Sequence, residues 1–115
     1  MNLIQRSLMC LVLAGAVAAG HADEGRKFHN YLVSLSEGER NQRLTELLVQ
    51  VPDRCVVERN FFRGLDPAGA AIWSAGCANK KAYAIKILDD AKGSTRILDC
   101  KVMMERAKVD CFSKL

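Results

Sequence analysis

Residues that commonly build catalytic and metal sites are scarce in this sequence. Two histidines occur among 115 residues, and aromatic residues make up 6% of the chain. His21 lies in a segment that we interpret below as a removable signal, which leaves His29 as the one histidine of the mature chain. Histidine alone therefore cannot supply a Ser-His-Asp triad or a histidine-rich metal site. The sequence also has no glycine-rich phosphate loop and no G-x-S-x-G turn. We expect no catalytic residues, no metal and no cofactor.

Blocks of like charge are missing as well. The 17 basic and 13 acidic residues are interspersed along the chain, with a formal net charge of +4. Arg6 is the one charged residue of the predicted signal, so 16 basic and 13 acidic residues remain after cleavage, a net charge of +3. A nucleic-acid-binding tail would show a run of about five or six like charges. We therefore expect no nucleic-acid partner.

A long hydrophobic segment is present only near the N-terminus, over residues 8–19. It is shorter than the roughly 20 residues that span a bilayer. It follows the basic Arg6 and ends in Gly20-His21-Ala22, directly before Asp23. This pattern predicts a secretory signal over residues 1–22, cleaved after Ala22, with Ala18 and Ala19 as alternative sites. An uncleaved anchor is the competing interpretation. After cleavage we expect no stable membrane anchor and a periplasmic or secreted location.

Cleavage removes Cys10 and leaves four cysteines, at positions 55, 77, 100 and 111. An even number of cysteines in a small exported domain is typical of disulfides. A zinc site would need closely spaced pairs, whereas these gaps are 22, 23 and 11 positions, with no histidine between them. Four cysteines allow three pairings, and spacing alone does not choose among them.

The mature chain is predicted to begin with a helical part over residues 23–51. Residues 23–34 place apolar side chains three or four apart, and a longer amphipathic helix is expected over residues 37–50. Ser36 and Glu39 fit a capping box at its start, and Pro52 ends it. Its apolar stripe either packs on the domain's own sheet, which we favour, or binds a partner; the stripe consists of Leu44, Leu47, Leu48 and Val51.

The remaining part, residues 55–115, has the pattern of a sheet. β-branched and aromatic residues predict strands over 55–63, 70–77, 83–88 and 94–100. Turns are expected at 64–69, at 78–81, where Asn79 can adopt a positive φ, and at 89–93. A short helix is expected over 101–109. Residues 23–115 are thus predicted to form a single small α+β domain, with an amphipathic helix packed on a four-stranded antiparallel meander.

The predicted hairpin gives a geometric reason for one cysteine pairing. If the first turn centres on Asp66, Cys55 lies opposite Cys77, and cross-strand neighbours are close to disulfide range. Cys100 and Cys111 flank the short C-terminal helix, so a second disulfide would join the C-terminus to the fourth strand. We therefore predict Cys55–Cys77 and Cys100–Cys111.

The segment from Cys55 to Leu115 resembles a group of small exported, periplasmic proteins of Gram-negative bacteria with a C-terminal four-cysteine domain. The residues that carry the resemblance are Cys55-Val56-Val57-Glu58-Arg59, Phe61-Phe62-Arg63-Gly64, Ile72-Trp73, Cys77-Ala78-Asn79, Ser94 to Cys100, and Cys111 to Leu115. Lys80 stands where a glycine is more usual in that pattern, which leaves the type of the second turn open. The resemblance implies a periplasmic, disulfide-bonded domain and brings no catalytic residues.

A helix on one side of a four-stranded sheet leaves the other side open. We expect this open face to be the binding face, bordered by four basic residues, Arg59, Arg63, Lys86 and Arg96. For the large aromatic residues the favoured interpretation is the core, and the competing one places some of them, Trp73 included, on the binding face. Asp89-Asp90 and Met103-Met104 are read as a turn and as packing residues, not as metal ligands.

These observations favour a non-enzymatic binding or interaction module of the bacterial periplasm, with an envelope protein as its partner. Two alternatives stay open. One is a small enzyme or cofactor-binding protein whose site is completed by a partner. The other is a structural protein of the envelope.

Overall fold

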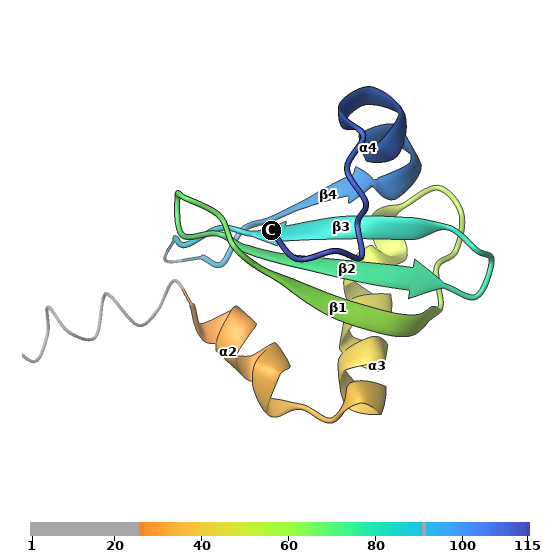
Figure 1. Ribbon diagram of the computed structural model, residues 1–115. Helices are drawn as coiled ribbons and strands as arrows, with labels where there is room; N and C mark the ends of the chain where they lie inside the picture. Colours follow the sequence, from red (N-terminus) through yellow and green to blue (C-terminus); the bar gives the residue numbers. More distant parts are fainter. Residues whose placement is uncertain (1–25, 91) are drawn as a thin grey trace, which may run out of the picture.

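A computed structural model describes residues 26–90 and 92–115 of the chain. The described chain folds into two helices, a 3-10 turn, four strands and a final helix (Figure 1). Their bounds in chain order are α2 (Lys27–Ser34), α3 (Glu37–Leu47), η1 (Leu48–Gln50), β1 (Val57–Leu65), β2 (Ala71–Cys77), β3 (Ala82–Ile87), β4 (Thr95–Asp99) and α4 (Cys100–Ala107). The predicted α+β class, the four strands and the short C-terminal helix are confirmed.

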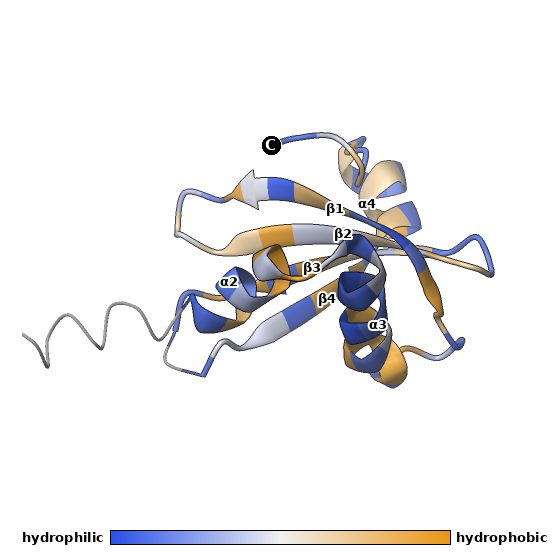
Figure 2. Ribbon diagram, turned by 90° about the horizontal axis from the view of Figure 1, so that it is seen from below, coloured by the Kyte–Doolittle hydropathy of each residue, from blue (hydrophilic) through white to orange (hydrophobic). Residues whose placement is uncertain are grey.

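The strands form one antiparallel sheet in the order β1-β2-β3-β4, which is the predicted meander. Helices α2 and α3 lie on one side of this sheet, and α4 lies on the other (Figure 1). β1 and β4 are the two edges (Figure 2). We call the side covered by α2 and α3 the inner face and the opposite side the outer face.

The core lies between the inner face and the two helices. The capping box at the start of α3 is confirmed, since the Ser36 hydroxyl accepts the amide of Glu39 and the Glu39 carboxylate accepts the amide of Ser36. The predicted apolar stripe packs on the sheet, as favoured from the sequence, with Leu44 of α3 and Leu48 of η1 fully buried. They meet a cluster contributed by α2 and the strands, whose main members are Leu32, Val57, Ala71, Trp73, Ala75, Tyr83, Ile85 and Ile87.

Both predicted disulfides are present, Cys55–Cys77 and Cys100–Cys111. The register used to predict the first one was wrong, however, because Val57 and not Cys55 lies opposite Cys77. The turn lies later than the assumed centre at Asp66, since Leu65 pairs with Ala71, and two irregularities, between Val57 and Arg59 and between Phe62 and Gly64, offset this shift only in part. Cys55 therefore lies just before the strand, and its side chain still reaches Cys77, with 5.1 Å between the Cα atoms.

The second turn also differs from the expectation. Lys80, not Asn79, has the positive φ, at 71°. The Asn79 side chain instead bonds the backbone, because its Oδ1 accepts the amide of Lys81 and its Nδ2 donates to the carbonyl of Arg54. The left-handed position in this turn thus falls one residue later than predicted, on a lysine.

The predicted signal, residues 1–22, lies outside the described residues, as do residues 23–25. Among the residues that the structure describes, no helix combines the length and the apolar character that a membrane crossing requires.

Candidate functional site

The five residues predicted to form a binding face do not share one face. Trp73 pairs with Phe62 on β1 and Ile85 on β3 and belongs to the inner face, where it is 2% exposed. The four basic residues lie on the outer face. For Trp73, the interpretation as a core residue is therefore correct.

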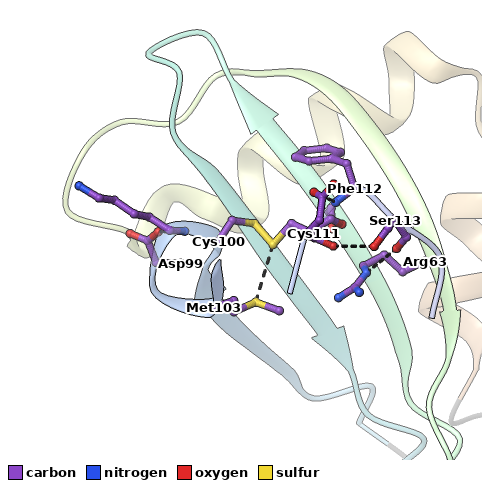
Figure 3. The surroundings of a disulfide bond; sticks show 10 residues. Arg63, Asp99, Cys100, Met103, Cys111, Phe112 and Ser113 are labelled. Carbon is purple, nitrogen blue, oxygen red and sulfur yellow. Dashed lines mark hydrogen bonds between the residues drawn. A yellow bond between two sulfur atoms is a disulfide. The ribbon is translucent and has the colours of Figure 1, made fainter. Parts of the chain in front are cut away.

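Arg59 and Arg63 are covered by the end of the chain and do not border an open surface. We call residues 110–115 the C-terminal tail. The Arg63 Nε donates to the carbonyl of Ser113 at 2.7 Å (Figure 3). The guanidinium of Arg59 lies over the ring of Phe112. Arg63 is only 7% exposed. The sequence reasoning left the outer face open because it did not anticipate that the tail folds back over β1 and β2.

The Cys100–Cys111 disulfide anchors this tail. Cys111 is buried, its carbonyl accepts the hydroxyl of Ser74, and the sulfur of Met103 lies 3.7 Å from its Sγ (Figure 3). The amide of Leu115 then donates to the carbonyl of Arg63 on β1 at 3.1 Å. The tail is thus held by one covalent bond and by hydrogen bonds to two strands.

Lys86 and Arg96 remain on the uncovered part of the outer face. The ammonium of Lys86 lies 3.1 Å from the Asp66 carboxylate in the β1–β2 turn. Arg96 is exposed on β4, and Leu98 on the same strand is 52% exposed. Of the predicted binding face, only these two basic side chains therefore border a surface that is open.

His29 joins an aromatic cluster that the sequence did not reveal. Its Nδ1 accepts a hydrogen bond from the Trp73 indole at 3.0 Å, which places the proton of the neutral ring on Nε2. Its ring lies 4.7 Å from that of Phe62, centre to centre. Burial lowers the pKa of His29, and the charge of nearby Arg26 lowers it further. The cluster joins α2 to the sheet, so we assign His29 a structural role.

No group of three or more histidine, cysteine, aspartate or glutamate side chains in the described part of the chain is arranged to hold a metal ion. Asp89 and Asp90 point to different partners, since Asp89 pairs with Arg26 and Asp90 accepts the amides of Lys92 and Ser94. Asp90 therefore acts as a turn residue, as expected from the sequence.

The edge of β4 offers free backbone groups. The amide of Leu88 donates to the carbonyl of Ser94, and the amide of Cys77 donates to the carbonyl of Lys81. Bonded and non-bonded residue pairs alternate along an antiparallel ladder, so successive residues of β3 direct their backbone groups toward β4 and β2 in turn. On β4 the bonded residues are then Arg96 and Leu98. The amides and carbonyls of Thr95 and Ile97 and the amide of Asp99 point away from the sheet and have no strand of the described chain beside them, whereas the carbonyl of Asp99 belongs to the first turn of α4.

At the opposite edge of the sheet, some backbone groups of β1 do have hydrogen-bond partners. On β1 the amide of Val57 donates to the Thr45 hydroxyl, and the carbonyl of Glu58 accepts from Asn41, both on α3. The carbonyl of Arg63 accepts from the C-terminal tail. The helix α3 and the C-terminal tail therefore form hydrogen bonds with part of the β1 edge, while the outward backbone groups of β4 have no such covering in the described chain.

A groove runs along the inner side of the β4 edge. Its volume is about 490 Å³, and we call it the β4 groove. Its apolar lining residues are Val51, Pro52, Tyr83 and Ile97. Its polar lining residues are Gln50, Asp53, Lys81 and Asp99. The ammonium of Lys81 pairs with Asp53 across the groove, and this hydrogen bond raises the pKa of Lys81.

A second hollow lies beyond the end of β4. Its volume is about 410 Å³, and it is lined by Lys80, Lys81, Ala82, Asp99, Cys100 and Lys101. We call it the lysine hollow. Lys81 and Asp99 line both spaces, so the β4 groove and the lysine hollow adjoin each other. Sequence reasoning noted the Lys80-Lys81 pair only as solvated turn residues, because nothing in the local pattern shows that Lys101 comes beside them.

Comparison with protein-family models, with curated proteins and with solved structures found no match to this chain.

Proposed function

We propose that this protein is a non-enzymatic binding module of the bacterial periplasm, which takes an extended segment of an envelope protein onto β4. The observation that carries the proposal is the bare edge of β4 beside the β4 groove. An added strand would bond the outward amides and carbonyls of Thr95 and Ile97 and the amide of Asp99. Strand addition of this kind combines main-chain hydrogen bonds, which supply affinity, with pockets for alternate side chains, which supply specificity.

The shape of the β4 groove fits such a ligand. In a strand added beside β4, every second side chain would point toward the inner face, where Ile97 and Tyr83 line the groove. The volume of about 490 Å³ accommodates one large apolar side chain with room to spare. An apolar residue opposite Ile97 would therefore be the anchor of the bound segment.

The proposed location rests on the disulfides and on the predicted signal. Two disulfides are typical of proteins that fold in an oxidising compartment. The resemblance of residues 55–115 to exported proteins of Gram-negative bacteria supports the periplasm as that compartment.

The test uses a panel of fluorescein-labelled nine-residue peptides with alternating apolar and polar residues, which differ in the central apolar side chain. Binding to the mature protein is measured by fluorescence anisotropy, and amide exchange is measured with the tightest peptide. We expect the amides of Thr95, Ile97 and Asp99 to exchange more slowly in the complex. A panel in which no peptide slows these amides would contradict the proposal.

A matched pair of variants at one position adds a second readout. Thr95→Pro removes an outward amide at the first residue of an edge strand, where proline is tolerated, and Thr95→Val keeps that amide. We expect Thr95→Pro to weaken peptide binding about tenfold, the effect of a lost hydrogen bond and a steric block together. Thr95→Val should bind within about twofold of the parent. Equal affinities for the two variants would count against strand addition.

A further inference from the structure

We infer that the segment bound along β4 carries an acidic residue beside its apolar anchor, and that this residue binds in the lysine hollow. This inference rests on the proposed function and names the chemistry of its ligand. It follows from three features of the end of β4: the continuity of the two spaces, their balance of charge, and the conformation of Lys80.

The two spaces form one path for a bound chain. The β4 groove lies beside Ile97, and the lysine hollow lies beyond Asp99, two residues further along the strand. A strand advances about 3.3 Å per residue, so a chain whose anchor lies opposite Ile97 reaches the lysine hollow within about two to four residues. A ligand long enough to form hydrogen bonds with β4 therefore extends to the lysines.

The charge of the hollow is positive once internal pairs are counted. Asp53 is paired with Lys81, and the Asp99 carboxylate accepts the amide of Lys101 at the start of α4. Lys80 and Lys101 are both exposed, and neither forms an ion pair with another described residue. The amide that Asp99 accepts is neutral, so Asp99 keeps its negative charge. The three lysines that line the hollow, set against Asp53 and Asp99, still leave a net charge of +1, which favours a carboxylate from the ligand.

The backbone of Lys80 adopts a conformation that is unfavourable for lysine. Its φ of 71° lies in the left-handed region, which is unfavourable for a residue with a Cβ and free of strain for glycine. The turn itself is held by Asn79, whose side chain bonds backbone on both sides, so the turn does not depend on a lysine. Lys80 does, however, line the lysine hollow and adds a positive charge there.

The experiment compares two probe peptides with two glycine variants. The probes are the tightest peptide of the panel carrying either glutamate or glutamine three residues from its anchor. Lys80→Gly removes the cation from the hollow and relieves a positive φ. Lys108→Gly does the same at the end of α4, where Lys108 has a φ of 54° and lies outside the hollow. Both variants should unfold at a higher temperature than the parent, which shows that they fold.

We expect the glutamate probe to bind the parent about two- to fivefold more tightly than the glutamine probe at low salt, as is usual for partly exposed ion pairs. The preference should fall as salt is added. Lys80→Gly should reduce it, and Lys108→Gly should keep it.

Each failure has its own signature. If both probes slow the amides of β4 but bind the parent equally, the acidic residue is wrong and the proposed function stands. If neither probe slows these amides, the proposed function fails as well. If the glutamate preference persists unchanged in Lys80→Gly, the carboxylate does not bind in the lysine hollow. If free phosphate binds the parent as tightly as the glutamate probe does, the hollow is a site for a small anion instead.

Discussion

At the scale of single residues, His29 has a structural role that comes from tertiary contacts and that its neighbours in the sequence do not indicate. The ring accepts the indole proton of Trp73 and packs against Phe62. Both partners lie more than 30 positions away in the sequence. Only folding brings them together, so no local pattern could have predicted the contact.

This contact predicts a dependence of stability on pH. The pKa of His29 lies below its ordinary value of 6.5, because burial disfavours the imidazolium and Arg26 repels it. As the pH falls, the unfolded chain therefore takes up the proton first. The stability contributed by neutral His29 is complete above about pH 6.5 and is lost as the pH falls through the folded pKa.

We expect the free energy of unfolding to decrease between pH 7 and pH 5 by less than about 1 kcal/mol, because the ring is partly exposed and one neutral hydrogen bond is lost. Urea unfolding at several pH values measures this change. His29→Gln should flatten the curve. Asp66 and Asp90 do not interfere, since hydrogen bonds lower the pKa of each below 3.8, first of all those from Lys86 to Asp66 and from Ser94 to Asp90. A slope that is the same in the parent and in His29→Gln would rule out His29 as its source.

At the scale of elements, helix α3 and the C-terminal tail cover complementary parts of the sheet. The helix and the η1 turn that follows it bury Leu44 and Leu48 on the inner face, and the helix bonds the β1 edge. The tail crosses the outer face over β1 and β2 and engages Arg59 and Arg63, so these side chains are not offered to a partner. The edge of β4 is the part of the sheet that neither α3 nor the C-terminal tail covers.

Removing the second disulfide tests the role of the tail. Cys100→Ala with Cys111→Ala should reduce the free energy of unfolding by about 3 kcal/mol, the chain-entropy value for a loop of this length. It should also speed exchange of the Leu115 amide, which bonds Arg63.

The control removes the first disulfide, by Cys55→Ala with Cys77→Ala. It should cost a similar free energy, because the loop between these cysteines is twice as long and the loop entropy grows only with the logarithm of loop length. Exchange of Leu115 should stay slow in folded protein. If both double variants loosen the tail equally, the anchoring role assigned to Cys100–Cys111 is wrong.

At the scale of the whole molecule, two disulfides stabilise a small domain. If each contributes about 3 kcal/mol, together they account for a large share of the roughly 5–15 kcal/mol that is typical of folded proteins. The fold thus depends on an environment in which cysteines are oxidised. This requirement ties the architecture to the proposed export of the chain.

We therefore expect protein isolated from the periplasm of an expressing bacterium to begin at Asp23. Its intact mass should be lower than that of the reduced chain by four hydrogen atoms, one pair for each disulfide. Alkylation without prior reduction should modify no cysteine. A chain that starts at Met1, or that carries free thiols while folded, would refute export or the oxidised state, respectively.

The sequence alone was sufficient for the α+β class, the four strands and the capping box of α3. Both disulfide pairings were predicted as well, the first of them from a register that the structure corrects. These features depend on local spacing: apolar residues at helical or alternating positions, a serine three residues before a glutamate, and cysteines at the ends of predicted elements. The bounds of β1 were predicted two residues too early, because Gly64 and Leu65 have the composition of a turn but still pair with Ile72 and Ala71.

Only the tertiary structure decided which surfaces are open. The path of the C-terminal tail, the face on which Trp73 lies and the meeting of Lys80 with Lys101 all depend on residues distant in the chain. Alternation along a strand assigns side chains to two faces, but what covers each face is settled by packing between elements, whose free energy depends on three-dimensional fit. For this reason the bare edge of β4, on which the proposed function rests, could not be predicted from the residues of β4 themselves.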